Sequence, residues 1–340
     1  MTSPAIGTGA TIFGCAGPHL GPDEAAFFRE ADPFGFILFA RNVETPEQLR
    51  RLTSDLREAV GRDAPVLVDQ EGGRVQRLRA PHWREWLPPL DQVTQSGARA
   101  AEGMAIRSRL IAQELREVGI DANCAPCADI ACPVTHPFLR NRCYGSDAET
   151  VTEVARAVAE AHLAGGVLPV VKHMPGHGRS AADTHHDLPT VDVDAATLAI
   201  TDFVPFHALA DLPMAMTSHI VFSAYDPVLP ATQSPAMIRV IRKEIGFQGL
   251  LMTDDLNMQA LAGTLAERAA LSIAAGCDIA LHCKGDLAEM QAVAAAAGRM
   301  GTETQARAVA ALACRKAPDD VDIRALEAKL AEILQGAPHG

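Results

Sequence analysis

Short apolar segments alternate with helical stretches along the whole chain, and this alternation limits the fold more than any other feature. The apolar segments lie at residues 10–15, 34–39, 65–68, 120–126, 167–171, 213–217, 250–253 and 278–282. Each has the length of a buried strand and is too short for a core helix. Strands separated by helices lie parallel in one sheet. Eight such units in 340 residues favour a closed (β/α)8 TIM-type barrel over an open doubly wound sheet, which stays as the alternative.

The C-terminal part, from about residue 286, has helical periodicity and no further strand, so we expect extra helices after the barrel. No Pro-, Gly- or Ser-rich linker divides the chain. We therefore predict a single catalytic barrel domain over residues 1–340. Abundant Ala, Leu and Val with only 4% aromatic residues fit helices packed on a parallel sheet.

The net charge of −12 argues against a nucleic-acid backbone as a partner. No apolar run is long enough to span a membrane, and residues 1–18 contain no Lys or Arg, so they lack the basic start of a secretory signal. We expect a cytoplasmic monomer that binds neither nucleic acid nor membrane. The eight cysteines are scattered, which predicts reduced, buried thiols in such a compartment.

Polar residues crowd the end of the strand predicted at 167–171. The sequence there continues Lys172-His173-Met174-Pro175-Gly176-His177-Gly178. Pro175 and the two glycines oppose a helix, so we expect these polar groups on a loop that begins where the strand ends. In a barrel, the C-terminal ends of all strands meet at one pocket. The polar set expected there is Asp69, Arg142, Lys172, His173, His177, Asp183, His185, His219, Asp254 and Asp255.

This set suits carbohydrate chemistry, because carboxylates with Arg and Lys recognise hydroxyl-rich or anionic ligands. A carboxylate opposite a proton donor is the minimum for cleaving an acetal. Four motifs in this order resemble the β-N-acetylhexosaminidases of glycoside hydrolase family 3. They are Asp69-Gln70-Glu71-Gly72-Gly73-Arg74-Val75, Asn141-Arg142-Cys143-Tyr144-Gly145, Lys172 to Gly178 with Asp183-Thr184-His185, and Thr253-Asp254-Asp255-Leu256-Asn257-Met258.

The resemblance assigns roles to residues. It implies that Asp254 is a nucleophile that forms a covalent glycosyl-enzyme, and that His185, partnered by Asp183, is the general acid/base. Loop residues so far from a strand predict a mobile loop that closes over substrate. The remaining matches, which imply contacts to sugar hydroxyls, are Asp69, Arg142, Lys172 and His173.

Each assignment has a plainer alternative. An Asp after a strand can cap the next helix, and Asp255 is a candidate for that. A His and an Asp on a solvated loop can be incidental. Lys172 can form an ion pair with Asp69 at the barrel rim, and Arg142 can be an exposed loop residue. For His177 and His219 the sequence does not separate a site residue from hydrogen-bonded scaffold.

The chain is similar in size to compact bacterial family members, which implies a retaining exo-β-N-acetylglucosaminidase. Its substrate would be terminal N-acetylglucosamine on peptidoglycan-derived muropeptides of the GlcNAc-anhydro-MurNAc type. The resemblance implies no cofactor and no metal. The aglycone stays open, as does the choice between water and phosphate as the acceptor.

Two other classes remain as alternatives. A metal-dependent barrel hydrolase could use the histidines, but Pro175 and Gly176 oppose the helix that would align His173 with His177. A catalytically inactive sugar-binding protein would lack the nucleophile or the acid/base, and here both are present. A zinc site on Cys124-x-x-Cys127 with Cys132 and Cys143 lacks a second pair of matching spacing, so we favour structural thiols.

Overall fold

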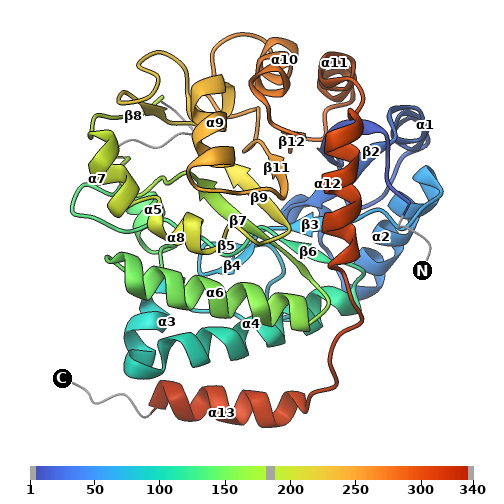
Figure 1. The fold of residues 1–340 in the computed structure, drawn as a ribbon. Helices are drawn as coiled ribbons and strands as arrows, with labels where there is room; N and C mark the ends of the chain where they lie inside the picture. Colours follow the sequence, from blue (N-terminus) through green and yellow to red (C-terminus); the bar gives the residue numbers. More distant parts are fainter. Residues whose placement is uncertain (1–4, 181–187, 336–340) are drawn as a thin grey trace.

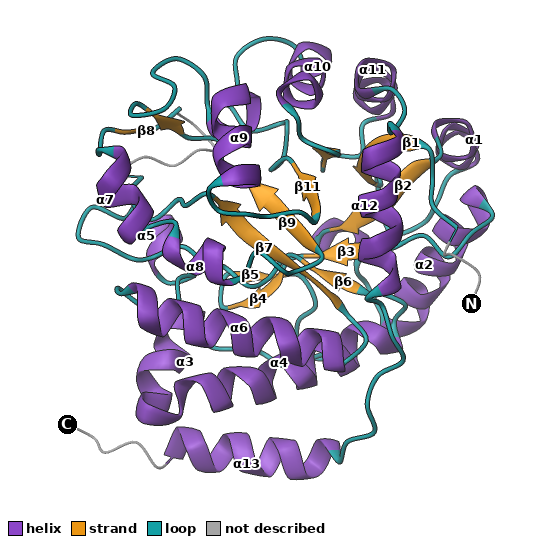
Figure 2. Ribbon diagram, in the orientation of Figure 1, coloured by secondary structure: helices purple, strands orange, loops and turns teal. Residues whose placement is uncertain are grey.

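The computed structural model describes residues 5–180 and 188–335, and its centre is a parallel sheet of eight strands surrounded by helices (Figure 1 and Figure 2). The strands lie in the order β11-β9-β7-β6-β3-β2-β1-β12, and a parallel bridge between Met252 and Ile279 joins the two edges of the sheet. The fold is therefore a (β/α)8 barrel, as the alternation predicts. The strands are β1 (Gly9–Gly14), β2 (Pro33–Leu38), β3 (Val66–Val68), β6 (Ala122–Asn123), β7 (Leu168–Met174), β9 (Met214–Thr217), β11 (Leu250–Met252) and β12 (Ala280–His282).

Helices cover the outside of the barrel and leave its strands buried on both faces. The longer helices are α1 (Pro22–Ala31), α2 (Pro46–Val60), α3 (Pro89–Ser96), α4 (Ala100–Glu117), α6 (Ala148–Ala164), α9 (Pro235–Lys243), α10 (Leu265–Ala275), α11 (Leu287–Ala297), α12 (Thr302–Ala313) and α13 (Ile323–Gln335). The helices expected from about residue 286 are α11, α12 and α13. Of these, α13 lies across α3 and α4 on the outside of the molecule (Figure 1).

Local sequence signals start several helices. Thr45 caps α2 by accepting a hydrogen bond from the Gln48 N–H at 3.2 Å, and Pro46 occupies the first turn, as the Thr-Pro sequence predicts. Asp147 caps α6 by accepting a bond from the Thr150 N–H at 2.8 Å. A cap satisfies a backbone donor that the helix itself leaves unpaired. α6 therefore begins directly after its capping residue, at Ala148.

The strand expected at 167–171 is longer than the prediction. β7 continues to Met174, so Lys172 and His173 lie on the strand, and the expectation that they lie on a loop is wrong. Charged residues can extend a buried strand when partners from other segments neutralise them. Here the partners come from the segments that follow β3 and β6.

The sequence pattern of residues 197–209 predicts one helix, and this prediction is wrong. The segment forms two short helices, α7 (Ala195–Ile200) and α8 (Val204–Ala208). Pro205 has no N–H for the carbonyl of Thr201 and would clash with it in a continuous helix. Thr201 leaves the helical conformation, with φ −127° and ψ −89°.

The segment after β3 forms a small hairpin, β4 (Gln70–Gly72) and β5 (Val75–Gln76), which the sequence pattern does not predict. Gly72 and Gly73 have φ of +109° and +58°, values that favour glycine. A Cβ at Gly72 would lie 1.6 Å from Nη2 of the buried Arg107. The hairpin thus needs glycine both for its backbone and for the approach of Arg107.

No helix in residues 5–180 or 188–335 combines the length and the hydropathy needed to cross a lipid bilayer.

Candidate active site

A cavity of about 130 Å³ lies over the C-terminal ends of the barrel strands. Five residues that the sequence assigns to the site line it: Asp69, Arg142, Lys172, His173 and Asp254. His177 and Asp255 line it as well. The predicted acid/base His185 and its partner Asp183, with their loop, lie outside the described residues. The structure thus brings the predicted sugar contacts and the predicted nucleophile to one cavity, and their roles in catalysis remain predictions.

Glu71 joins two of the cations that line this cavity, Arg142 and Lys172. It accepts two parallel hydrogen bonds from Arg142, at 2.9 and 2.8 Å, and its carboxylate lies 2.6 Å from Nζ of Lys172. Burial opposes ionisation of Glu71, but Arg142 and then Lys172 outweigh it and lower its pKa to about 2. Arg142 is only 9% exposed, so the alternative of an exposed loop residue is wrong.

Lys172 also donates to Asp69 at 2.8 Å, and Arg77 pairs with the other oxygen of Asp69 at 2.9 Å. The rim ion pair considered as an alternative for Lys172 is therefore present, and both partners still line the cavity. Burial would raise the pKa of Asp69, but Lys172 and Arg77 hold it far below its ordinary range. These groups are charged and fixed in position, which suits them to recognise dense hydroxyl groups.

Asp129 orients His173. Its Oδ2 lies 2.7 Å from Nδ1 of His173, and its Oδ1 accepts from the backbone N–H of His177 at 2.7 Å. The other ring nitrogen of His173, Nε2, lies 3.3 Å from Nη2 of Arg142. Burial would raise the pKa of Asp129, but His173 and His177 hold it well below its ordinary value. A carboxylate behind an imidazole fixes the ring and its tautomer.

Asp254 follows β11, and one of its oxygens accepts from the Asp255 N–H at 2.8 Å. Burial opposes its ionisation, but the positive charge that His173 and His219 carry when protonated, together with this hydrogen bond, lowers the pKa of Asp254. The carboxylate is ionised at neutral pH and lines the cavity shared with Lys172 and Arg142. An ionised carboxylate in this position can act as a nucleophile or as a base.

Asp255 and His219 hold the loop that carries Asp254. Asp255 accepts from the N–H groups of Asn257 at 3.1 Å and Cys283 at 3.2 Å, and it caps no helix, because Thr264 caps α10. The helix-capping alternative for Asp255 is therefore wrong. His219 bonds through Nε2 to the Asp255 carbonyl at 3.1 Å and through Nδ1 to a threonine hydroxyl. His219 does not line the cavity and supports this loop, whereas His177 faces the cavity.

The Asp255→Asn enzyme is expected to be more stable than the wild type at pH 7.5 but not at pH 3.5. Burial, with the charge of Asp254, raises the pKa of Asp255 to about 6. A folded-state pKa above the unfolded one means that the protonated form folds better. Ionisation of Asp255 therefore destabilises the folded protein. This destabilisation is absent below about pH 4 and complete above about pH 6.

Asparagine keeps the acceptor and lacks the charge, so the gain at pH 7.5 should be about 3 kcal/mol. Urea denaturation of both enzymes at the two pH values measures it. A gain of equal size at both values would show that charge is not the cause.

Three charged residues of this network were not predicted as site residues: Glu71, Arg77 and Asp129. Glu71 lies in the motif that begins at Asp69. Two cations, Arg142 and Lys172, need more than one buried carboxylate to neutralise them, and this need is the signal that could have identified Glu71. Asp129 follows the fourth predicted strand, where the strand-end rule could have found it. No local pattern points to Arg77, because its role depends on the β4–β5 hairpin.

A carboxylate at the C-terminal face of a (β/α)8 barrel fits glycoside hydrolysis, which is one of several reactions that this fold supports. A sequence profile described as "Glycosyl hydrolase family 3 N terminal domain" matches residues 27–313. The Beta-hexosaminidase of Methylococcus capsulatus is 34% identical over 316 residues, which are 91% of this chain and 92% of the relative. The Beta-hexosaminidase of Alkalilimnicola ehrlichii is 37% identical over 282 residues, 81% of this chain and 80% of the relative.

Solved structures agree with this match. NagZ from Neisseria gonorrhoeae in complex with N-trifluoroacetyl-D-glucosamine superposes with a TM-score of 0.85 at 27% identity, covering 98% of this chain and 99% of that chain. The chain belongs to glycoside hydrolase family 3, among its beta-hexosaminidases. It is an enzyme that hydrolyses glycosidic bonds.

Proposed function

We propose that this enzyme is a retaining exo-β-N-acetylglucosaminidase that uses Asp254 as its nucleophile. One observation carries the proposal: Asp254 lines the same cavity as the Lys172, Asp69 and Arg142 network. A sugar bound to that network would present its anomeric carbon to a carboxylate at the strand end. The N-acyl glucosamine bound by the Neisseria NagZ supports an N-acetylated sugar as the ligand class.

The reaction has two steps. In the first, Asp254 attacks the anomeric carbon and forms a glycosyl ester, while His185 gives its proton to the leaving oxygen. In the second, His185 takes a proton from water, and the water oxygen replaces Asp254 at the same carbon. Two inversions restore the β configuration. Asp183 orients His185 and stabilises its charged form.

The natural substrate we infer is a muropeptide of the GlcNAc-anhydro-MurNAc type, from which the enzyme removes terminal N-acetylglucosamine. The agreement in length and fold with NagZ supports this inference. We also infer that residues 1–340 act as a single catalytic domain and as a cytoplasmic monomer. Light scattering of the purified protein measures the oligomeric state, and a dimer would contradict the inferred monomer.

The activity is tested with a set of aryl glycosides. We expect release from the β-N-acetylglucosaminide, much less from the β-glucoside, and no change of product on addition of phosphate. Nuclear magnetic resonance during the first turnovers should detect the β-anomer of N-acetylglucosamine before mutarotation. Initial α product would mean inversion and a different arrangement of carboxylates.

His185→Ala should affect substrates according to their leaving groups. We expect a loss of about 10²–10⁴-fold on alkyl or sugar leaving groups and a much smaller loss on activated aryl groups, which need little protonation. The comparison of kcat/KM across a series of leaving-group pKa values measures this. His186→Ala is the matched control and should behave like the wild type. Equal losses on both kinds of substrate would contradict an acid/base role for His185.

A further inference from the structure

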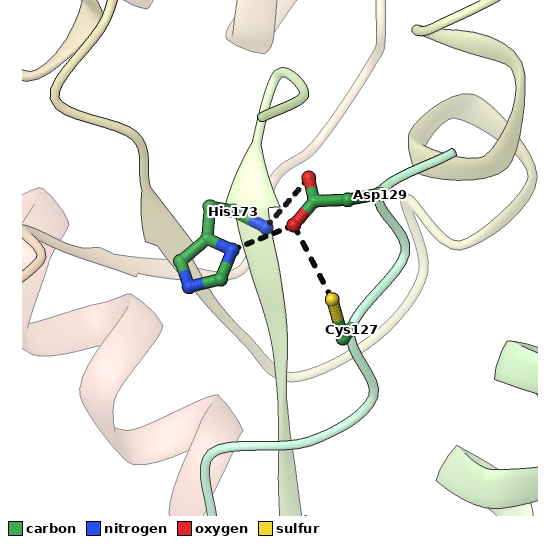
Figure 3. Close-up of side chains that lie close together, drawn as sticks. All are labelled: Cys127, Asp129 and His173. Atoms are coloured by element: carbon green, nitrogen blue, oxygen red, sulfur yellow. Dashed lines mark hydrogen bonds and ion pairs between the residues drawn. The ribbon is translucent and has the colours of Figure 1, made fainter. Parts of the chain in front are cut away.

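Three possible metal ligands of different chemistry meet behind the sugar cavity. They are the Sγ of Cys127, a carboxylate oxygen of Asp129 and the Nδ1 of His173, all buried and all within 4.8 Å of one another. Figure 3 shows the thiol and the imidazole pointing at the same carboxylate. Oδ2 of Asp129 lies 3.3 Å from the sulfur and 2.7 Å from Nδ1. One oxygen thus serves two proton donors.

Backbone contacts fix the relative positions of the three side chains. Cys127 forms a parallel bridge with Lys172, the residue before His173, and the Ala128 N–H donates to the Lys172 carbonyl at 2.7 Å. The other oxygen of Asp129, Oδ1, accepts from the N–H groups of His173 at 3.3 Å and His177 at 2.7 Å. Oδ1 can therefore keep its backbone donors while Oδ2 turns to a different partner.

Sulfur, nitrogen and oxygen donors together are a ligand set that Zn²⁺ accepts. Around a tetrahedral zinc such donors are roughly 3.3–3.6 Å apart. The sulfur–oxygen distance of 3.3 Å already fits, and the carboxylate–imidazole separation of 2.7 Å has to open by about 0.6 Å. A thiolate and a carboxylate neutralise a divalent cation, so a metal here would leave no net charge in a buried site. Three protein ligands leave a fourth position for water.

We propose that Cys127, Asp129 and His173 form a binding site for Zn²⁺ or a similar thiophilic divalent cation, and that this metal inhibits sugar binding. The metal displaces the thiol proton, which leaves to solvent, and takes the lone pair of Nδ1. In a neutral His173 the ring proton then moves from Nδ1 to Nε2. No electron is transferred, and one proton is released for each metal bound.

The inhibition follows from the change in the tautomer of His173. With its proton on Nδ1, His173 donates to Asp129 and Nε2 accepts from Nη2 of Arg142, 3.3 Å away. With a metal on Nδ1, the Nε2–H faces the N–H of Arg142, and two donors oppose each other. Arg142 must then move from the position in which it lines the cavity. The inhibitory part rests on the proposed function, whereas the metal site does not.

The test uses Co²⁺ and Zn²⁺ alone as probes. Titration with Co²⁺ should produce a thiolate-to-cobalt charge-transfer band, which reports the metal site without any substrate. Incubation with Zn²⁺ should raise KM for an aryl β-N-acetylglucosaminide by about tenfold or more, with a smaller effect on kcat, and a chelator should reverse it.

Cys127→Val and Cys127→Ser should both lose the cobalt band and the inhibition, while their metal-free kinetics stay close to the wild type. Serine retains a donor to Asp129, so the Cys127→Ser result still tests the proposal if the valine variant folds poorly. Cys314→Ser, which changes a thiol at the C-terminal end of α12, is the matched control and should retain both signals. A cobalt band and zinc inhibition that persist in both Cys127 variants would overturn the proposal, as would the absence of a band in the wild type.

Discussion

Asp254→Asn is expected to lower kcat/KM for an aryl β-N-acetylglucosaminide by about ten thousand-fold. The amide cannot form the glycosyl ester, so both chemical steps lose their route. Binding of N-acetylglucosamine should change little, because the groups proposed to hold the sugar hydroxyls are the separate Lys172, Asp69 and Arg142 network. Steady-state kinetics with calorimetric titration of the sugar measure the two effects separately.

Asp255→Asn is the matched control, since it removes a neighbouring carboxylate that also lines the cavity. Its acceptor role toward the N–H groups of Asn257 and Cys283 survives in the amide. We expect this variant to lose about tenfold at most. Comparable losses in the two variants, or normal turnover in Asp254→Asn, would remove Asp254 as the nucleophile.

Glu71→Ala is expected to destabilise the protein by about 3–5 kcal/mol, because it leaves two buried cations without their shared anion. The side chains of Glu71 and Lys172 are each 2% exposed, so water cannot replace the missing carboxylate. Denaturation in urea at pH 7 measures the change. The remaining activity should have a raised KM, since Arg142 loses both of its hydrogen bonds to Glu71.

Glu47→Ala is the control for this experiment. Glu47 pairs with Arg50 on the surface at 3.4 Å, with 75% of its side chain exposed, so water solvates Arg50 when the carboxylate is removed. The free energy of unfolding of this variant should stay close to the wild type. If Glu71→Ala were no more destabilising than Glu47→Ala, the buried network would not contribute to stability as we describe.

The barrel was predictable from the sequence because its signals are local. Each strand is a short apolar run, and helix starts such as Thr45–Pro46 depend on residues that are neighbours in sequence. Asp69, Arg142, Lys172, His173 and Asp254 could be expected at one cavity because parallel strands of a barrel end on the same face. Their common position follows from topology rather than from contacts.

The parts that sequence reasoning missed depend on partners far along the chain. β7 extends through Lys172 because Glu71, 101 positions earlier, neutralises it. Asp129 follows β6 and contacts His173 on the neighbouring strand β7. Arg77 contacts Asp69 because the β4–β5 hairpin folds the chain back, and the glycines of that hairpin gave no strand signal. The break between α7 and α8 follows from Pro205, whose effect on the backbone outweighs the helical pattern around it.

A glycosyl ester on Asp254 is the most specific consequence of the proposed mechanism. The His185→Ala enzyme should accumulate it with an activated aryl β-N-acetylglucosaminide, because the first step needs little acid help while the second lacks its base. Acid quenching, proteolysis and mass spectrometry would then locate the adduct. We predict one N-acetylhexosamine residue attached to Asp254. An adduct on another carboxylate, or a quenched enzyme that carries no sugar while aryl release continues, would contradict the mechanism.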